Sequence, residues 1–139
     1  MIDVNSKPFP DLAPSTTRPF WTNAKAGRFV LQRCTQCATF QFHPKPWCIE
    51  CGSRDLQWTD AKSGGTIYSF TVSRTVAMNY AGWEGELPVL MCLIDLDDGA
   101  RMYAQVTHCE ADAIHIGMRV RVYLEDIGQE AGIPKFRPE

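Results

Sequence analysis

Two cysteine pairs with identical spacing are the strongest chemical signal in this sequence. Cys34-x-x-Cys37 and Cys48-x-x-Cys51 are separated by ten residues. Such a set could be a redox pair, two disulfides or one metal site. The N-terminal residues contain no apolar run, and no segment approaches the roughly 18 apolar residues of a membrane span. We therefore expect a soluble, cytoplasmic protein, and in a reducing compartment the four cysteines are expected to bind metal.

The residues around the cysteines favour one closed site. Each pair is followed by a small residue, Ala38 or Gly52, so each can form a tight knuckle whose backbone amides point at the thiolates. The ten residues between the pairs suffice for a hairpin that brings the knuckles together. Four thiolates in a tetrahedron suit one structural zinc per chain. Iron in a rubredoxin-like centre has the same geometry and remains the alternative.

The other reactive side chains do not form a catalytic set. Cys92 lies within an apolar run and is expected to be a buried apolar residue. His108 and Cys109 are adjacent, but neighbouring strand residues point to opposite faces and no third group orients them. We predict no catalytic role for the remaining candidates, which are His43, His115, Asp95, Asp97 and Asp98.

The elements that must position the cysteines lie on both sides of them. Residues 1–15 contain three prolines and are expected to form an extended arm. Residues 16–60 are expected to form a short helix and a zinc ribbon, with Thr17 as the helix cap and Gly27 as its end. Phe20 and Trp21 lie on one helical face, and this pair is predicted either to join the core or to contact a partner. Strands are expected directly before and after the knuckles, at 29–33 and 56–58.

The pattern changes to strands in residues 61–139. A turn is expected at 63–65 and a tight turn at 97–99. Residues 110–116 are expected to form a helical or turn connection. Strands are predicted at 66–74, 88–96, 100–106, 118–126 and near 133–136, the second of them buried on both faces. The fold class is therefore mainly β: a helix and ribbon followed by a five-stranded OB-fold barrel, with an open sandwich as the alternative.

Composition and charge narrow the function. The chain has 139 residues, of which 45% are hydrophobic and 22% charged, and its net charge is -2. Residues 16–60 carry six basic and three acidic side chains, whereas residues 61–139 carry seven basic and eleven acidic ones. A groove that binds single-stranded nucleic acid should be basic. A nucleic-acid-binding module is therefore the alternative function and not the favoured one.

The loop from Val76 to Leu87 joins the first two barrel strands and carries Met78, Tyr80 and Trp83. Large aromatic side chains on a loop either cover the barrel mouth or bind something. We predict that Tyr80 and Trp83, together with Phe20, Trp21 and Phe136, contact a partner protein or an acyl-CoA.

Taken in order, these motifs resemble a known family. The residues that carry the resemblance are Phe20-Trp21, Gly27-Arg28, LQRCTQCATFQFHPKPWCIECGS, GTIYSFTV from Gly65, IGMRV from Ile116 and Phe136-Arg137-Pro138. The sequence is similar to acyl-CoA-associated proteins in which a rubredoxin-like zinc ribbon precedes an OB-fold. The match extends over nearly the whole chain, so we do not expect this chain to contain the dehydratase domain that is fused to some relatives.

The resemblance implies a function that the residues alone do not give. Members of the family act beside a thiolase-like or ketosynthase-like subunit. It implies a non-catalytic accessory subunit of a complex that makes or breaks a carbon–carbon bond in a 3-oxoacyl-CoA, for example in the degradation of aromatic compounds or sterol side chains. A coenzyme A thioester would then be a ligand of the complex.

Overall fold

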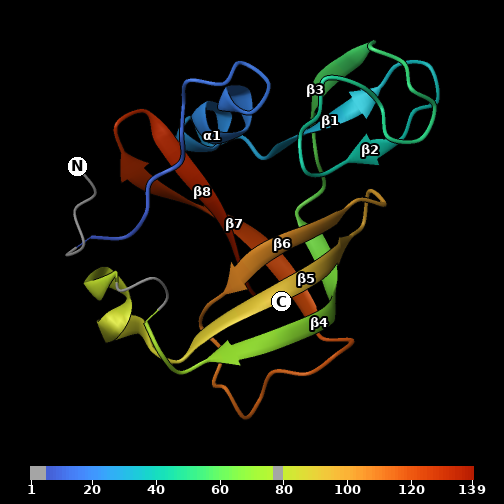
Figure 1. Cartoon of the computed structure of the whole chain (residues 1–139). Coiled ribbons are helices and arrows are strands. Elements are labelled where there is room, and N and C mark those ends of the chain that lie inside the picture. Colours follow the sequence, from blue (N-terminus) through green and yellow to red (C-terminus); the bar gives the residue numbers. More distant parts are fainter. Residues whose placement is uncertain (1–5, 77–79) are drawn as a thin grey trace.

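The computed structural model describes residues 6–76 and 80–139 and contains two separate sheets joined by a short link (Figure 1). A helix, α1, precedes the first sheet, and a short 3-10 helix, η2, lies between the first two strands of the second. The elements are α1 (Arg18–Lys25), β1 (Val30–Cys34), β2 (Phe40–Gln41), β3 (Leu56–Asp60), β4 (Gly64–Ser73), η2 (Ala81–Glu86), β5 (Val89–Leu96), β6 (Arg101–Val106), β7 (Arg119–Gly128) and β8 (Ala131–Pro138).

The second sheet is a closed five-stranded barrel in the order β4-β5-β6-β8-β7. Antiparallel pairing of β4 with β7 closes one side, from Gly64 opposite Arg121 to Thr66 opposite Arg119. Parallel pairing of β6 with β8, at Val106 and Phe136, closes the other. The expected mainly β fold with an OB-fold barrel is confirmed, and the open sandwich is excluded because the sheet has no free edge between these strands.

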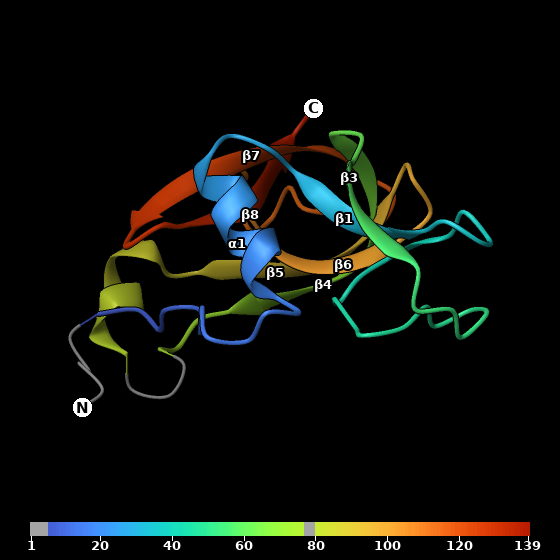
Figure 2. The ribbon, with the colours of Figure 1, turned by 90° about the horizontal axis from the view of Figure 1, so that it is seen from above.

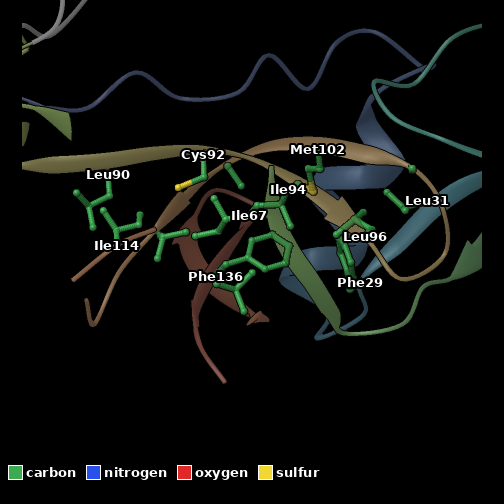
Figure 3. Close-up of a cluster of buried hydrophobic side chains, with 14 of the residues drawn as sticks. Phe29, Leu31, Ile67, Leu90, Cys92, Ile94, Leu96, Met102, Ile114 and Phe136 are labelled. Carbon is green, nitrogen blue, oxygen red and sulfur yellow. The ribbon is translucent and has the colours of Figure 1, made fainter. Parts of the chain in front are cut away.

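Alternating side chains from the strands fill the barrel (Figure 3). Phe136 and Cys92 are completely buried, and Phe29 from the ribbon side packs edge-on against Phe136 at 6.4 Å between ring centroids. The expectation that β5 would be buried on both faces is wrong. Its residues alternate, with Leu90, Cys92 and others inside and Met91 only half-buried, because only part of its outer face is covered.

Helix α1 packs on the barrel strands β7 and β8 and also contacts β1 of the first sheet. Thr17 occupies the N-cap position and Pro19 lies in the first turn, as predicted, but the threonine hydroxyl makes no capping hydrogen bond. Gly27 ends the helix in a left-handed conformation (φ 86°), and the next N–H, of Arg28, donates to Asn23 O at 2.8 Å. The helix lies directly on β8, where a Cβ at Gly132 would sit 2.6 Å from the Lys25 nitrogen. Figure 2 shows α1 crossing the outside of the barrel.

Two other expectations are corrected and one is confirmed. The stretch 63–65 is largely strand and not a turn, because Gly65 lets β4 approach β5 so closely that a Cβ there would lie 2.6 Å from an Ile94 methyl. The connection at 110–116 contains turns, one of the two forms expected for it. The last strand is longer than predicted because it pairs with β7 along most of its length. Among residues 6–76 and 80–139, no helix has the length and apolar character needed to cross a membrane.

Candidate functional site

The four cysteines of the two pairs come together at the tip of the first sheet. Their sulfur atoms all lie within 4.8 Å of one another. Cys34 Sγ is 3.6 Å from Cys51 Sγ, and Cys37 Sγ is 3.6 Å from Cys48 Sγ. A tetrahedron with metal–sulfur bonds of about 2.3 Å has edges of about 3.8 Å. The donor set and its dimensions therefore fit a tetrahedral metal ion.

The two knuckles are built in the same way. The Ala38 N–H donates to Cys34 O at 2.9 Å, and the Gly52 N–H donates to Cys48 O at 2.9 Å. Both turn residues have positive φ angles, 65° and 78°, which place the backbone in a left-handed conformation. In the second knuckle a backbone N–H, that of Glu50, points at Cys48 Sγ at 3.4 Å.

The surroundings favour thiolates at part of the cluster. The Thr39 hydroxyl, 3.2 Å from Cys37 Sγ, is the main cause that lowers the pKa of Cys37 to about 6. The Cys37 backbone N–H lowers the pKa of Cys34. At Cys51 the Ser53 backbone N–H acts in the same direction, but the neighbouring thiols and burial outweigh it and raise its pKa to about 12. A cation bound by the sulfurs would hold all four as thiolates.

Two buried glutamines fix the loop that carries the second knuckle. The Gln32 amide donates to Lys45 O at 2.9 Å and accepts the Lys45 N–H at 2.9 Å. The Gln41 amide donates to Trp47 O at 3.0 Å and to Gln32 Oε1 at 2.8 Å. Its own oxygen accepts the Ile49 N–H at 2.9 Å. Sequence reasoning missed this pair, because nothing in a single glutamine shows that it will be buried and fully paired.

The remaining reactive groups lie apart from the cysteine cluster. His43 is not among its members, and burial together with Lys45 lowers the pKa of this histidine. Cys92 points into the barrel (Figure 3), where burial raises the pKa of its thiol to about 11. Burial and Glu110 also raise the pKa of Cys109. Neither thiol has the lowered pKa of an activated nucleophile.

His108 and Cys109 are adjacent in the chain but have different hydrogen-bond partners. His108 Nδ1 lies 2.9 Å from the Thr107 hydroxyl, which in turn lies 2.6 Å from the Tyr123 hydroxyl. Cys109 Sγ donates instead to Glu110 O at 3.4 Å. His115 Nδ1 lies 3.1 Å from Ala113 O in an exposed turn.

The aspartates at the β5–β6 hairpin form ion pairs or hydrogen bonds within the protein. Asp95 pairs with Arg101 at 2.6 Å, and Asp97 pairs with Arg119 at 2.8 Å. Asp98 accepts the Lys62 N–H at 2.6 Å. Each carboxylate therefore has its own partner within the protein.

The aromatic side chains expected at a partner or acyl-CoA surface fall into two groups. Phe20 is 2% exposed and Phe136 is 0% exposed, so both rings belong to the core and a direct contact by either does not fit this structure. Trp21 and Trp83 are half-buried and line one groove, and Tyr80 is half-buried beside it at the start of η2. Met78 lies outside the described residues.

Two apolar side chains on the ribbon are more exposed than any of these. Trp47 is 48% exposed and Ile49 is 56% exposed, on either side of the buried Cys48. Sequence reasoning missed them as surface candidates. The available signal was their position next to a metal ligand, in a module too small to bury both.

Both parts of the chain match known protein domains. Residues 21–57 match the family model of the ChsH2 rubredoxin-like zinc ribbon domain. Residues 58–125 match the model of the ChsH2 C-terminal OB-fold domain. A chain of the solved Ltp2-ChsH2(DUF35) aldolase is 31% identical, with a TM-score of 0.73 over 91% of this chain and 97% of that one. The protein belongs to the ChsH2 (DUF35) family.

Other ChsH2-like proteins differ in length and description. A probable enoyl-CoA hydratase alpha subunit from Thermomonospora curvata is 34% identical over 86% of this chain. The match spans only 36% of that protein, so this chain corresponds to about a third of it. A DUF35 domain-containing scaffold protein from Methanocaldococcus jannaschii is 28% identical over 70% of this chain and 68% of its own length. A DUF35 protein of unknown function from Sulfolobus solfataricus, 11% identical with a TM-score of 0.56, shares the fold.

Proposed function

We propose that this protein is a non-catalytic accessory subunit, held in shape by one zinc ion, of an enzyme complex that acts on coenzyme A thioesters in the cytoplasm. The partner we propose is a thiolase-like or ketosynthase-like subunit that makes or breaks a carbon–carbon bond in a 3-oxoacyl-CoA. One observation carries the proposal: the similarity to a chain of the Ltp2-ChsH2(DUF35) aldolase extends over 97% of that chain.

The names of other relatives support a subunit role. One is described as a scaffold protein, and two as alpha subunits of CoA-ester hydratases, including the 3-oxo-4,17-pregnadiene-20-carboxyl-CoA hydratase of Mycobacterium tuberculosis, which is 26% identical over 79% of this chain. Subunits and scaffolds work through a partner. The same role would explain why this small domain carries exposed and half-buried aromatic side chains.

The residues of this chain support a structural role for this subunit and a catalytic role for the partner. Cys34, Cys37, Cys48 and Cys51 would hold zinc, and a site with four protein thiolates leaves no open position for a substrate. Cys92 is enclosed in the barrel and Cys109 has a raised pKa, so the proposal assigns the reactive nucleophile to the partner. This subunit would contribute shape and contact surface to the acyl-CoA site.

The test is reconstitution. The zinc-loaded protein is titrated into a purified thiolase-like candidate partner, while complex formation is followed by light scattering and substrate cleavage by release of the CoA ester product. We expect one saturable complex and a rise in the partner's activity over the same titration. Trp83→Ala, Tyr80→Ala and Trp21→Ala should weaken assembly, because a buried interface aromatic contributes about 2 kcal/mol or more.

The matched control is Arg121→Ala, which removes an exposed side chain from the outer face of the barrel. We expect it to leave assembly nearly unchanged. Absence of a complex together with unchanged partner activity would sink the accessory-subunit proposal. The protein would then be tested against single-stranded nucleic acid at low salt.

A further inference from the structure

A groove of about 660 Å³ lies outside the barrel, apart from the cysteine cluster. Its floor is the outer face of β6, and its walls are α1, the arm at residues 6–9, η2 and the β7–β8 hairpin. Figures 1 and 2 both show the arm running past η2 on its way to α1. Binding sites for small molecules commonly have volumes of roughly 300–1,000 Å³, so the groove is large enough to hold one.

A buried amide on the floor of this groove lacks a partner. Gln105 is 8% exposed, and its Oε1 accepts no hydrogen bond from the part of the chain that the structure describes. Because Val106 pairs with Phe136 inside the barrel, the preceding residues Gln105 and Lys135 lie next to each other on the outside. Lys135 is only 6% exposed but has its own partner, the Glu125 carboxylate. Buried polar groups are nearly always paired, so an unpaired acceptor in a groove calls for a donor from outside the chain, supplied by water or by a ligand.

The side chains that line the groove indicate the chemical character of the rest of the ligand. Phe9, Trp21, Phe42 and Trp83 line the groove with aromatic surface. The charges around it form ion pairs within the protein: Lys135 with Glu125, Lys25 with Asp126, and Lys7 with Glu86. Since these pairs neutralise the groove, they favour an uncharged ligand over an anion or a cation.

The arm is held in place as the outer wall. Lys7 Nζ lies 4.6 Å from the ring centroid of Trp83 and pairs with Glu86 on the same 3-10 helix. A Cβ at Gly82 would lie 2.9 Å from the Lys7 nitrogen, so the backbones of the arm and η2 are in direct contact. The wall is therefore part of the folded protein.

We infer that this groove is a binding site for an uncharged, amphipathic small molecule with an apolar or aromatic body and an N–H or O–H group that donates to Gln105. Gln105 fixes the orientation of the molecule, and Trp21 and Trp83 contact its apolar body. The inference does not rest on the proposed function, because it follows from the groove of the isolated chain.

The probe for this site is N-phenyl-1-naphthylamine, an uncharged fluorophore with two aromatic groups and one N–H. Its comparison compound is 1-naphthyl phenyl ether, which has nearly the same shape and no donor. We expect saturable binding of the amine and several-fold weaker binding of the ether. Gln105→Leu should reduce this preference by about fivefold, the effect of one neutral hydrogen bond. Trp21→Ala should weaken binding of both compounds, and Trp47→Ala, which changes a ribbon residue that does not line the groove, should weaken neither.

A second measurement tests whether the amine binds beside Gln105. In amide NMR spectra the Gln105 side-chain signals should shift on addition of the amine, while those of Gln32 and Gln41 stay fixed because these amides are already paired inside the ribbon. Absence of binding, equal affinity for both compounds, or an unchanged preference in Gln105→Leu would each overturn the inference. These outcomes leave the proposed function untouched, since reconstitution with the partner does not depend on either probe.

Discussion

The ribbon and the barrel differ in how their buried glutamine side chains are hydrogen-bonded. In the ribbon, Gln32 and Gln41 lie between two strands and the knuckle loop, and each atom of both amides has a partner. On the barrel, Gln105 is buried to a similar degree, but its oxygen has no partner among the described residues. A paired amide holds the ribbon together, whereas an unpaired one costs stability unless a bound molecule supplies its partner. The comparison therefore separates residues that build the fold from a residue available for binding.

The largest effect should follow the loss of a metal ligand. Cys48→Ser replaces a buried sulfur of the cluster, and we expect loss of zinc and unfolding of the ribbon, because structural zinc sites contribute about 10 kcal/mol or more to folding in small modules. Elemental analysis and amide NMR spectra measure both effects. Most barrel signals should persist, with shifts near Phe29, which links the ribbon to the barrel core.

Cys109→Ser is the matched control, because this thiol lies outside the cluster. It should keep one zinc per chain. A native-like ribbon in metal-free Cys48→Ser protein would show that the two buried glutamines suffice to hold the loop and that the cluster is not structural.

The next largest effect should follow the loss of a paired glutamine in the ribbon. Gln41→Leu leaves Trp47 O and the Ile49 N–H without their partner, and it removes one of the two hydrogen bonds that Gln32 Oε1 accepts. We expect the free energy of unfolding to fall by about 3 kcal/mol, since each unpaired buried group costs about 1–3 kcal/mol and part of the loop can relax. Urea unfolding in excess zinc measures the loss, and transfer of zinc to a chelator should become faster.

Gln105→Leu should have the opposite effect on the free energy of unfolding to Gln41→Leu. It removes an unpaired amide and adds apolar volume to a groove lined by aromatic rings, so the free energy of unfolding should stay constant or rise by up to about 1 kcal/mol. The same urea titration gives the value. A loss comparable to that of Gln41→Leu would mean that Gln105 builds the fold as well, and the contrast between the two regions would disappear.

The smallest effect concerns an exposed ion pair and its pH dependence. The hydrogen bond from Arg119 lowers the pKa of Asp97. A carboxyl with a lowered pKa stabilises the protein above its unfolded pKa of about 3.9, and this contribution is lost as the pH falls through the folded pKa. Asp97→Asn should therefore cost less than about 1 kcal/mol at pH 7, and the difference from the wild type should shrink below pH 4.

The check is thermal unfolding of both proteins between pH 7 and pH 3. Asp112→Asn, on the exposed turn after β6, is the control and should show no such pH-dependent difference. A difference for Asp97→Asn that grows on acidification would contradict the direction of the pKa shift.

Most of the fold follows from local sequence signals. Alternating apolar residues in 118–126 and the Asp-Asp-Gly turn before Ala100 mark the barrel strands, and the structure has strands at these places. Gly27 ends α1 as expected because only glycine adopts its left-handed conformation without strain. The errors fall where distant segments meet: Gly65 is in a strand because β5 passes close to it, and Phe136 is buried because β6 pairs with β8.

The sequence by itself determined the cysteine cluster, since two Cys-x-x-Cys knuckles are local structures whose ligand chemistry is contained in their spacing. It also determined the strands, because strand alternation is a property of neighbouring residues. Only the tertiary structure decided which aromatic rings are buried and which of three glutamines lacks a partner. Burial and hydrogen bonding depend on segments far apart in the chain, such as β6, which carries Gln105, and the arm at residues 6–9, which line the same groove in the folded protein.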